Sequence, residues 1–375
     1  MKLFQANFVN DSWSAPINEK SLPDAELVLV FGTQQSYRQQ YPMLHKCFPD
    51  AEFVGCSTAG EISDISVADD SLSLTAIHLQ HSCCKVVSAR HTSALDSETM
   101  GKQLAKQLDL TALKHTLVFS EGININGTAL ARGLTTVLAN RCLVSGGLAG
   151  DGDRFAATYT WHNEQVHQNQ VIAVGLYGDR LEVGHGSLGG WDPFGPPRKI
   201  TAAKDNVLLQ LDGQSALTLY KKYLGEYAAD LPASGLLFPL SVKVDEDQPA
   251  VVRTILGINE QEQSMTFAGD MPQGCYAQLM KANFDRLIDG ATGAAQATSK
   301  MLKHSPQLTI LVSCVGRKMV LKQRIEEEVE AVKELLGANT VQCGFYSYGE
   351  LSPVVETGDC ALHNQTMTIT TITEL

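Results

Sequence analysis

Three short loops hold the residues of this 375-residue sequence whose types and spacing could do chemistry. They span 55–61, 145–151 and 344–350, and each begins with a small residue and ends in glycine followed by an acid. Glycine-rich loops that follow strands can bind phosphates through backbone N–H groups. Here Glu61 stands where a phosphate-binding loop has its lysine, and its negative charge would repel a phosphate. The pattern therefore argues against a phosphate-binding loop.

Covalent and metal chemistry find little support in the same segments. Cys56 and Ser57 lie on a strand-exit loop, where hydrolases place a nucleophile, but the second glycine of a nucleophile elbow is missing. No sequence cue assigns a histidine partner to them or to Cys314. The chain contains no C-x-x-C, H-E-x-x-H or C-x-x-C-H motif. We therefore expect a protein that is not an enzyme.

The remaining hypothesis is that the loops bind a small molecule. Loops at strand ends are where open α/β sheets bind their ligands. Backbone N–H groups, an arginine and several acids suit a small polar molecule such as an amino acid. The alternative is that the loops only close tight turns. The candidate ligand-binding residues are Cys56, Ser57, Thr58, Glu61, Asp151, Arg154, Arg317, Tyr346 and Glu350.

The elements that would position these loops form a repeat. Each loop ends a unit of strand, helix and strand, whose first strands are predicted at 27–31, 116–119 and 308–312. The predicted second strands are 52–54, 141–144 and 340–343, and the helices of the second and third units are predicted at 128–138 and from about 320 to 336. Buried strands joined through helices favour parallel pairing. The runs at 71–79, 171–177, 251–258 and 366–373 suit antiparallel strands.

The fold class is therefore α/β, with two domains of mixed sheets flanked by helices and built on the repeated unit. A cluster of proline and glycine at 191–197 divides the chain near its middle. We place the domains at 1–200 and 201–375, and the last strand of the second domain can return to a sheet.

Composition sets limits on function and location. The chain is 44% hydrophobic and 19% charged, which is typical of globular proteins, and its net charge of -12 argues against a nucleic-acid surface. Nine cysteines without regular spacing indicate reduced thiols of a cytosolic protein. The sequence shows neither an export signal nor an apolar run near the roughly 18 residues of a membrane span. We expect a cytoplasmic protein with no membrane and no nucleic-acid partner.

At these residues the sequence resembles the FIST family, whose members combine an N-terminal and a C-terminal FIST region. The resemblance runs from about residue 27 to the end of the chain. It implies intracellular signal transduction and the sensing of small ligands such as amino acids. The two FIST regions fill this chain, so its output is expected in another protein. The segments that carry the resemblance are 55–61, 146–152, 211–213 with Ala216, 314–317, 344–350 and 363–366.

Stand-alone bacterial FIST proteins of this size resemble nitric-oxide-sensing haem proteins that regulate a histidine kinase. The resemblance thus implies non-covalently bound haem b, a diatomic gas as signal and a kinase as partner. Haem needs an axial side chain, most often histidine, in apolar and aromatic surroundings. His185 is the first candidate, since it lies close to Trp191 and Phe194 in a glycine-rich strand end. His363 is the second, although its motif can simply order the C-terminal strand.

Two hypotheses about function therefore stand side by side. The first is a haem-based nitric oxide sensor that changes the activity of a histidine kinase. The second is a FIST protein that binds an amino acid or another small polar metabolite and signals through a partner. A third, an enzyme that uses Cys56 or Cys314, lacks an adjacent base. The sequence leaves open whether the protein forms a homodimer.

Overall fold

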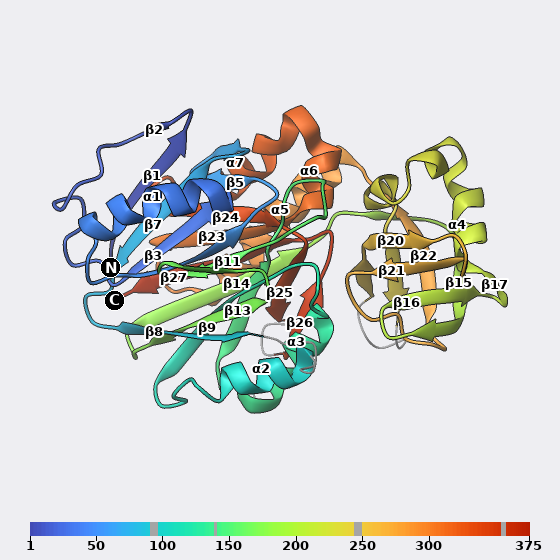
Figure 1. Ribbon diagram of the computed structural model, residues 1–375, viewed down its shortest axis with the longest axis horizontal. Coiled ribbons are helices and arrows are strands. Elements are labelled where there is room, and N and C mark those ends of the chain that lie inside the picture. Colours follow the sequence, from blue (N-terminus) through green and yellow to red (C-terminus); the bar gives the residue numbers. More distant parts are fainter. Residues whose placement is uncertain (91–96, 139–140, 244–249, 354–357) are drawn as a thin grey trace.

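The computed structural model describes residues 1–90, 97–138, 141–243, 250–353 and 358–375 (Figure 1). In this part of the chain, three mixed sheets lie together and a fourth, antiparallel sheet lies at one end of the molecule. The predicted α/β class with mixed sheets flanked by helices is confirmed. None of the described helices is both long and apolar enough to cross a membrane.

Each mixed sheet is built around one of the three predicted units. In every unit a helical segment connects two strands, and these strands pair in parallel. In the third unit a single helix was predicted, but the connection contains two α-helices. The first of them ends at Lys322, which adopts a positive φ of 48°. The units are β3 (Leu27–Gly32), α1 (Gln34–Cys47) and β4 (Glu52–Ser57); β9 (Leu113–Ser120), α3 (Gly127–Leu138) and β10 (Leu143–Leu148); and β23 (Leu308–Cys314), α6 (Val315–Leu321), η3 (Lys322–Arg324), α7 (Ile325–Leu336) and β24 (Val341–Ser347).

Antiparallel strands extend each parallel pair on its first-strand side. They are β7 (Leu72–His78) and β1 (Lys2–Val9) in the first sheet, β13 (Gln170–Tyr177) and β8 (Cys83–Arg90) in the second, and β27 (Met367–Glu374) and β14 (Leu181–Leu188) in the third. The short strands β2 (Ser12–Trp13), β12 (Gln165–His167), β26 (Cys360–His363) and β6 (Ser66–Ala68) lie at sheet edges. The last strand, β27, thus lies between β14 and β23.

A cyclic exchange of strands joins the three sheets. The strand that follows each glycine loop leaves its own unit and pairs antiparallel with the second strand of another unit. These pairs are β5 (Glu61–Ser63) with β24, β11 (Thr160–His162) with β4, and β25 (Gly349–Pro353) with β10. The segments 55–61, 145–151 and 344–350, hereafter loops 1, 2 and 3, are therefore held next to one another. Much of each is strand, contrary to prediction, and only 58–60, 149–151 and Tyr348 lie between strands.

Backbone hydrogen bonds close the loops into a ring. The amide of Ala59 in loop 1 donates to the carbonyl of Tyr346 in loop 3 at 2.8 Å. The amide of Tyr348 in loop 3 donates to Leu148 O in loop 2 at 3.2 Å, and that of Gly150 in loop 2 to Ser57 O in loop 1 at 2.9 Å. Each loop thus both donates to one neighbour and accepts from the other.

The strands of the three units have continuous apolar sequences because both faces of these sheets are covered by apolar cores. In β3, Leu29 and Phe31 belong to the core between the sheets, whereas Val28 and Val30 pack against α1. Phe31, Phe119 and Phe345 meet in the inner core, with ring centroids 4.8 to 6.2 Å apart. Helices α2 (Ser97–Ala105), α3, α5 (Phe284–Met301) and α7 contribute to the outer core of the other two sheets. Strands with two buried faces read as continuous apolar runs.

The fourth sheet belongs to residues 192–281, hereafter the appended unit, which extends away from the three sheets (Figure 1). It has its own apolar core. Its elements are β15 (Asp192–Lys204), β16 (Val207–Leu211), β17 (Gln214–Ser215), α4 (Ala216–Leu224), η1 (Gly225–Asp230), η2 (Ala233–Leu237), β18 (Leu240–Lys243), β19 (Val251–Arg253), β20 (Ile255–Asn259), β21 (Ser264–Phe267) and β22 (Tyr276–Lys281). The predicted boundary at 200 falls inside β15, and the exchanged strands combine both predicted regions in single sheets.

Candidate functional site

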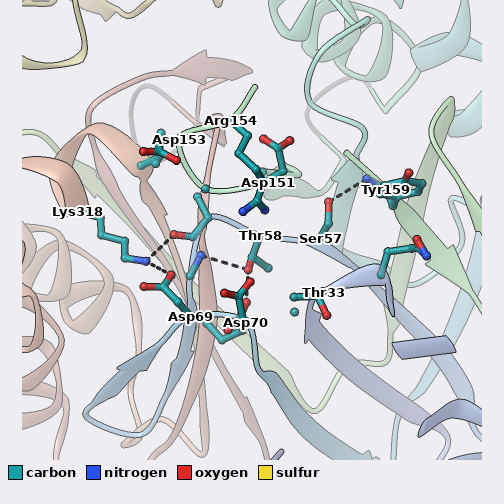
Figure 2. Close-up of a pocket in the computed structure, with 18 of the residues that line it drawn as sticks. Thr33, Ser57, Thr58, Asp69, Asp70, Asp151, Asp153, Arg154, Tyr159 and Lys318 are labelled. Atoms are coloured by element: carbon teal, nitrogen blue, oxygen red, sulfur yellow. Dashed lines mark hydrogen bonds and ion pairs between the residues drawn. The ribbon is translucent and has the colours of Figure 1, made fainter. Parts of the chain in front are cut away.

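A pocket of about 460 Å³ opens where loops 1 and 2 meet the first turn of α1 and helix α6 (Figure 2). Most of the described residues that line it are polar or charged, and none of them is a histidine or a cysteine. The side chains that bear on function come from five segments of the chain. They are Thr33 and Gln34; Ser57, Thr58 and Glu61; Asp69 and Asp70; Asp151, Asp153, Arg154 and Tyr159; and Lys318 with Met319.

Loop 1 forms the floor of the pocket and is fixed by its own hydrogen bonds. Ser57 Oγ accepts a hydrogen bond from the amide of Tyr159 at 2.9 Å. Thr58 Oγ1 donates to Glu61 Oε1, while Glu61 Oε2 accepts from the amide and the hydroxyl of Ser71 at 3.1 and 2.6 Å. Burial raises the pKa of Glu61 to about 7, against the lowering effect of these hydrogen bonds. The carboxyl group of Glu61 therefore ties loop 1 to the start of β7.

Lys318 forms one wall from helix α6. Its Nζ donates to the carbonyl of Ala59 at 2.8 Å, forms an ion pair with Asp69 and lies 5.7 Å from the ring centroid of Tyr346. Gly60, at a φ of 137°, makes this approach possible, because a Cβ there would lie 2.5 Å from Nζ. The ammonium group is thus held over loop 1 (Figure 2).

Three other charged side chains that line the pocket have no partner among the described residues. The guanidinium of Arg154 is exposed and, among the described residues, makes no ion pair or hydrogen bond. In that same set the carboxylates of Asp70 and Asp153 are exposed and equally unpaired. Figure 2 shows the Arg154 side chain directed toward the space above Thr58. Free charges of both signs therefore face one small volume.

Helix α1 adds a positive end to this volume. Thr33 is its N-cap, and Thr33 Oγ1 accepts a hydrogen bond from the amide of Ser36 at 3.1 Å. The first turn contains no acidic residue, so no side chain of its own offsets the positive end of the helix dipole. An anionic group of a ligand would be stabilised there and by Arg154.

Asp151 lines the pocket, but its carboxylate is already engaged. It accepts hydrogen bonds from the amides of Ala156 and Ala157 at 2.9 Å each and from the hydroxyl of Tyr348. Tyr348 also stacks on Phe155, with ring centroids 4.3 Å apart. Asp151 therefore holds the segment that carries Arg154 in place.

Five of the nine predicted ligand-binding residues line this pocket, namely Ser57, Thr58, Glu61, Asp151 and Arg154. The other four, Cys56, Arg317, Tyr346 and Glu350, are buried and do not line it. Cys56 belongs to the inner core, where desolvation raises its pKa well above the ordinary value. The sequence could not separate these four from the lining residues, because neighbouring residues of a strand or helix point to different faces.

Glu350 and the Arg317–Tyr346 pair are engaged in internal networks instead. Glu350 accepts from Ser347 Oγ at 2.6 Å and from the amide and hydroxyl of Thr366, and burial raises its pKa to about 8. Arg317 pairs with buried Glu328 at 2.7 Å, and the Tyr346 hydroxyl donates to the same carboxylate at 2.8 Å. Both networks are shut off from solvent.

The residues predicted for haem do not form one site. Trp191 donates its Nε1–H to the carbonyl of Gln365 at 2.9 Å, and Phe194 packs in the core of the appended unit, 6.3 Å from the ring of Phe238. His363 contacts the carbonyl of Ser352 through Nε2 at 3.0 Å, and burial lowers its pKa to about 4.

His185 is buried on β14, which is covered by α5, and its amide donates to the sulfur of Met301 at 3.5 Å. None of the four lines the pocket described above, and that pocket offers neither an imidazole nor a thiolate. Their positions do not fit an enclosed macrocycle with an axial ligand.

Sequence reasoning missed several residues of the pocket, above all Lys318, Asp69, Asp70 and Asp153. Lys318 follows Arg317 directly, and in a helix of 3.6 residues per turn only one of the two can face the pocket. Asp153 lies two residues beyond the glycine-acid pattern, which is a signal that could have been followed. Asp69 and Asp70 lie in a turn before β7, where nothing in the local sequence points back to loop 1.

Comparison with known protein families finds two family matches along the chain. The FIST N domain model matches residues 26–214, and the FIST C domain model matches residues 216–353. No curated protein matches the sequence.

Among solved structures, a cyanuric acid hydrolase from A. caulinodans is similar at a TM-score of 0.38 and 9% identity, with 99% of each chain covered. A second solved structure is titled "Cyanuric acid hydrolase: evolutionary innovation by structural concatenation". It is similar at a TM-score of 0.36 and 10% identity, and the match covers 100% of this chain and 99% of that one. At TM-scores below 0.5 these similarities carry no argument about activity.

Proposed function

Because this chain belongs to the FIST family, whose domains sense small ligands in signalling, we propose that it senses a small polar ligand in the pocket between loops 1 and 2. The ligand would carry an anionic group and a cationic group, as an amino acid does. A volume of about 460 Å³ is within the usual range for small-molecule sites.

One observation carries this proposal: charges of both signs that pair with no other described residue line the same pocket. Arg154 and the N-terminus of α1 would bind the anionic group, and Asp70 with Asp153 would bind the cationic group. Val315, Met319 and the ring of Tyr159 offer an apolar surface for the rest of the molecule. A ligand with one charge only would leave one of the two sets without a partner.

Thermal unfolding in the presence of each proteinogenic amino acid tests the proposal. At a concentration of about 100 Kd a bound ligand adds roughly 2.7 kcal/mol to the free energy of unfolding, which raises Tm by a few degrees. Arg154→Ala removes charge-assisted hydrogen bonds of about 1.5–3 kcal/mol and should weaken binding roughly 10- to 100-fold. Arg180→Ala is the matched control, since Arg180 is exposed and does not line the pocket. Equal shifts in both variants would rule out the Arg154 contact, and no shift with any amino acid would rule out this ligand class.

Output is proposed to pass to a separate signalling protein, for which a histidine kinase is the prediction from family resemblance. Co-purification of the purified chain with a candidate kinase, with and without the ligand identified above, measures this directly. Homodimer formation also stays a prediction, and light scattering of the purified protein decides it.

The haem-based nitric oxide sensor stays a prediction from resemblance, without support from the positions of His185, His363, Trp191 and Phe194. The visible absorption spectrum of protein purified from haem-sufficient cells tests it. A Soret band that shifts with nitric oxide would support haem, while colourless protein that takes up no added haem would exclude it.

A further inference from the structure

Both segments through which the chain crosses to and from the appended unit meet at one buried side chain, Arg317. The chain enters the unit after Gly189 and returns from it into α5, whose first turn contains Leu287. Arg317 donates to the carbonyl of Gly189 and, at 2.7 Å, to the carbonyl of Leu287. Its side chain is fully buried. A single guanidinium therefore holds the two crossing segments together.

The crossing segments also lie directly against each other. A Cβ on Gly290 would lie 2.3 Å from the carbonyl oxygen of Gly189, and one on Gly190 would lie 2.0 Å from that of Arg286. Backbone contacts this close leave no room for one segment to shift without the other. Movement of Arg317 would therefore change how the appended unit is held.

The same guanidinium is connected to the pocket floor through two residues, Glu328 and Tyr346. Arg317 pairs with Glu328, whose other oxygen accepts from the hydroxyl of Tyr346 at 2.8 Å. The main chain of Tyr346 exchanges two hydrogen bonds of 2.8 Å with Ala59 and Gly60 in the pocket floor. All of these side chains are fully buried, and hydrogen bonds in a low-dielectric interior reinforce one another.

Lys318 supplies a second connection, because it is the next residue on α6. Its ammonium lies in the pocket wall over the ring of Tyr346, while the neighbouring guanidinium lies in the interior. On the far side of α6, the absence of a Cβ at Gly316 lets Gln365 pack against the helix. Gln365 Nε2 donates to Leu236 O and Thr254 Oγ1 of the appended unit, at 3.1 and 3.0 Å. Helix α6 thus contacts the pocket, the crossing segments and a side chain that binds the unit.

We propose that Arg317 is a positioning residue that couples occupancy of the pocket to the orientation of the appended unit. This inference rests on the proposed function, because a ligand that draws on Lys318 or loop 1 would change the bonds of Tyr346 and α6. The appended unit would then be the part of the chain whose presentation to a signalling partner depends on the ligand.

Hydrogen-exchange mass spectrometry of the full chain tests the coupling without any ligand. Lys318→Ala disturbs the pocket wall, and we expect amides in 187–192 and 282–288 to exchange roughly five- to tenfold faster. Lys300→Ala is the matched control, because this exposed lysine lies at the other end of α5 and does not line the pocket. A response to Lys318→Ala that stays within the pocket loops would overturn the proposal.

A second background shows whether Arg317 carries the effect. Arg317→Met combined with Glu328→Gln removes both buried charges together, so that neither is left unpaired, and keeps an acceptor for Tyr346. In this background Lys318→Ala should add no further exchange at the crossing segments. An added effect of the same size as in the wild type would refute the role of Arg317. If the double variant does not fold, Tyr346→Phe cuts the link to Glu328 alone and should reduce the effect of Lys318→Ala.

Thermal shifts with amino acids keep the two proposals apart. Loss of the exchange response in a protein that still binds an amino acid would contradict the coupling alone. Absence of amino-acid binding with the exchange response intact would contradict the proposed ligand and leave the connection between the pocket and the appended unit.

Discussion

Loops 1 and 3 contain the same hydrogen-bond network in two different settings. In each, a hydroxyl three residues before the acid donates to one of its oxygens, through Thr58 to Glu61 and through Ser347 to Glu350. The other oxygen accepts from the amide and hydroxyl of the residue just before an antiparallel strand, which is Ser71 before β7 or Thr366 before β27. Glu61 nevertheless borders the open pocket, whereas Glu350 is sealed in the interior.

The comparison shows that the glycine-acid pattern ties a loop to a strand and does not by itself make a binding site. What differs is the residue before the glycine, which is Ala59 in loop 1 and Tyr348 in loop 3. The ring of Tyr348 stacks on Phe155 and its hydroxyl binds Asp151. The loop that borders the open pocket thus has a small residue before its glycine, and the loop whose acid is buried has a large one.

Removal of the sealed acid should have the largest effect. Glu350→Ala leaves three buried donors without an acceptor, and we expect the free energy of unfolding to fall by about 3–5 kcal/mol. Glu61→Ala should cost less, because water in the pocket can replace the lost acceptor. Urea denaturation measures both, with Glu334→Ala, an exposed acid on α7, as a control expected to stay within about 0.5 kcal/mol. Equal losses at Glu61 and Glu350 would contradict the contrast drawn here.

The two acids should also make stability depend on pH. Their folded pKa values, about 7 for Glu61 and about 8 for Glu350, lie above the ordinary glutamate value, so the folded state binds more protons than the unfolded state. This contribution to stability is complete below about pH 4.5 and is lost as pH rises to 7 and 8, at up to about 1.4 kcal/mol per pH unit for each group. In a plot of the free energy of unfolding against pH, Glu61→Gln should reduce the slope up to about pH 7. Glu350→Gln should reduce it up to about pH 8. Variants whose slopes match the wild type would show that neither acid holds a proton in the fold.

A smaller loss of stability is expected from a change at Tyr348, the large residue before the glycine of loop 3. Tyr348→Phe keeps the ring but removes the hydroxyl that donates to Asp151, which should lower the free energy of unfolding by about 2 kcal/mol. Because Asp151 holds the segment of Arg154, amino-acid binding should weaken as well. Tyr276→Phe is the control, since Tyr276 is 52% exposed. A stability loss without any change in binding would separate Tyr348 from the pocket.

The smallest effect concerns two ion pairs that are built alike. Lys318 and Lys333 each donate to a backbone carbonyl and pair with an exposed acid, Asp69 or Asp64. Asp69→Asn and Asp64→Asn should each cost less than about 1 kcal/mol, because such pairs are screened by solvent. Only Asp69→Asn should alter amino-acid binding, since Asp64 lies outside the pocket. An equal change in binding in both variants would point to a general electrostatic effect.

Much of the fold was predictable because buried strands leave a strong apolar signal. The runs at 27–31 and 308–312 correspond to β3 and β23, and the parallel pairing of each unit is confirmed. The exchange of strands was not predictable, because Ser63 pairs with Cys343, and no local pattern records a partner that far along the chain. For the same reason the sequence showed that loop 1 is polar, but it could not show that Lys318 contacts this loop.

The ring of exchanged strands has a consequence for synthesis. The first sheet needs β11, the second needs β25 and the third needs β5, so no unit finishes its sheet from its own residues. Contacts between residues so far apart close large loops, which slows folding. Until residues near 353 have left the ribosome, the strands that await partners expose open edges that can pair with other chains. The first sheet has all of its strands once residue 167 has been made, whereas β5 must wait for β24, and β10 must wait for β25.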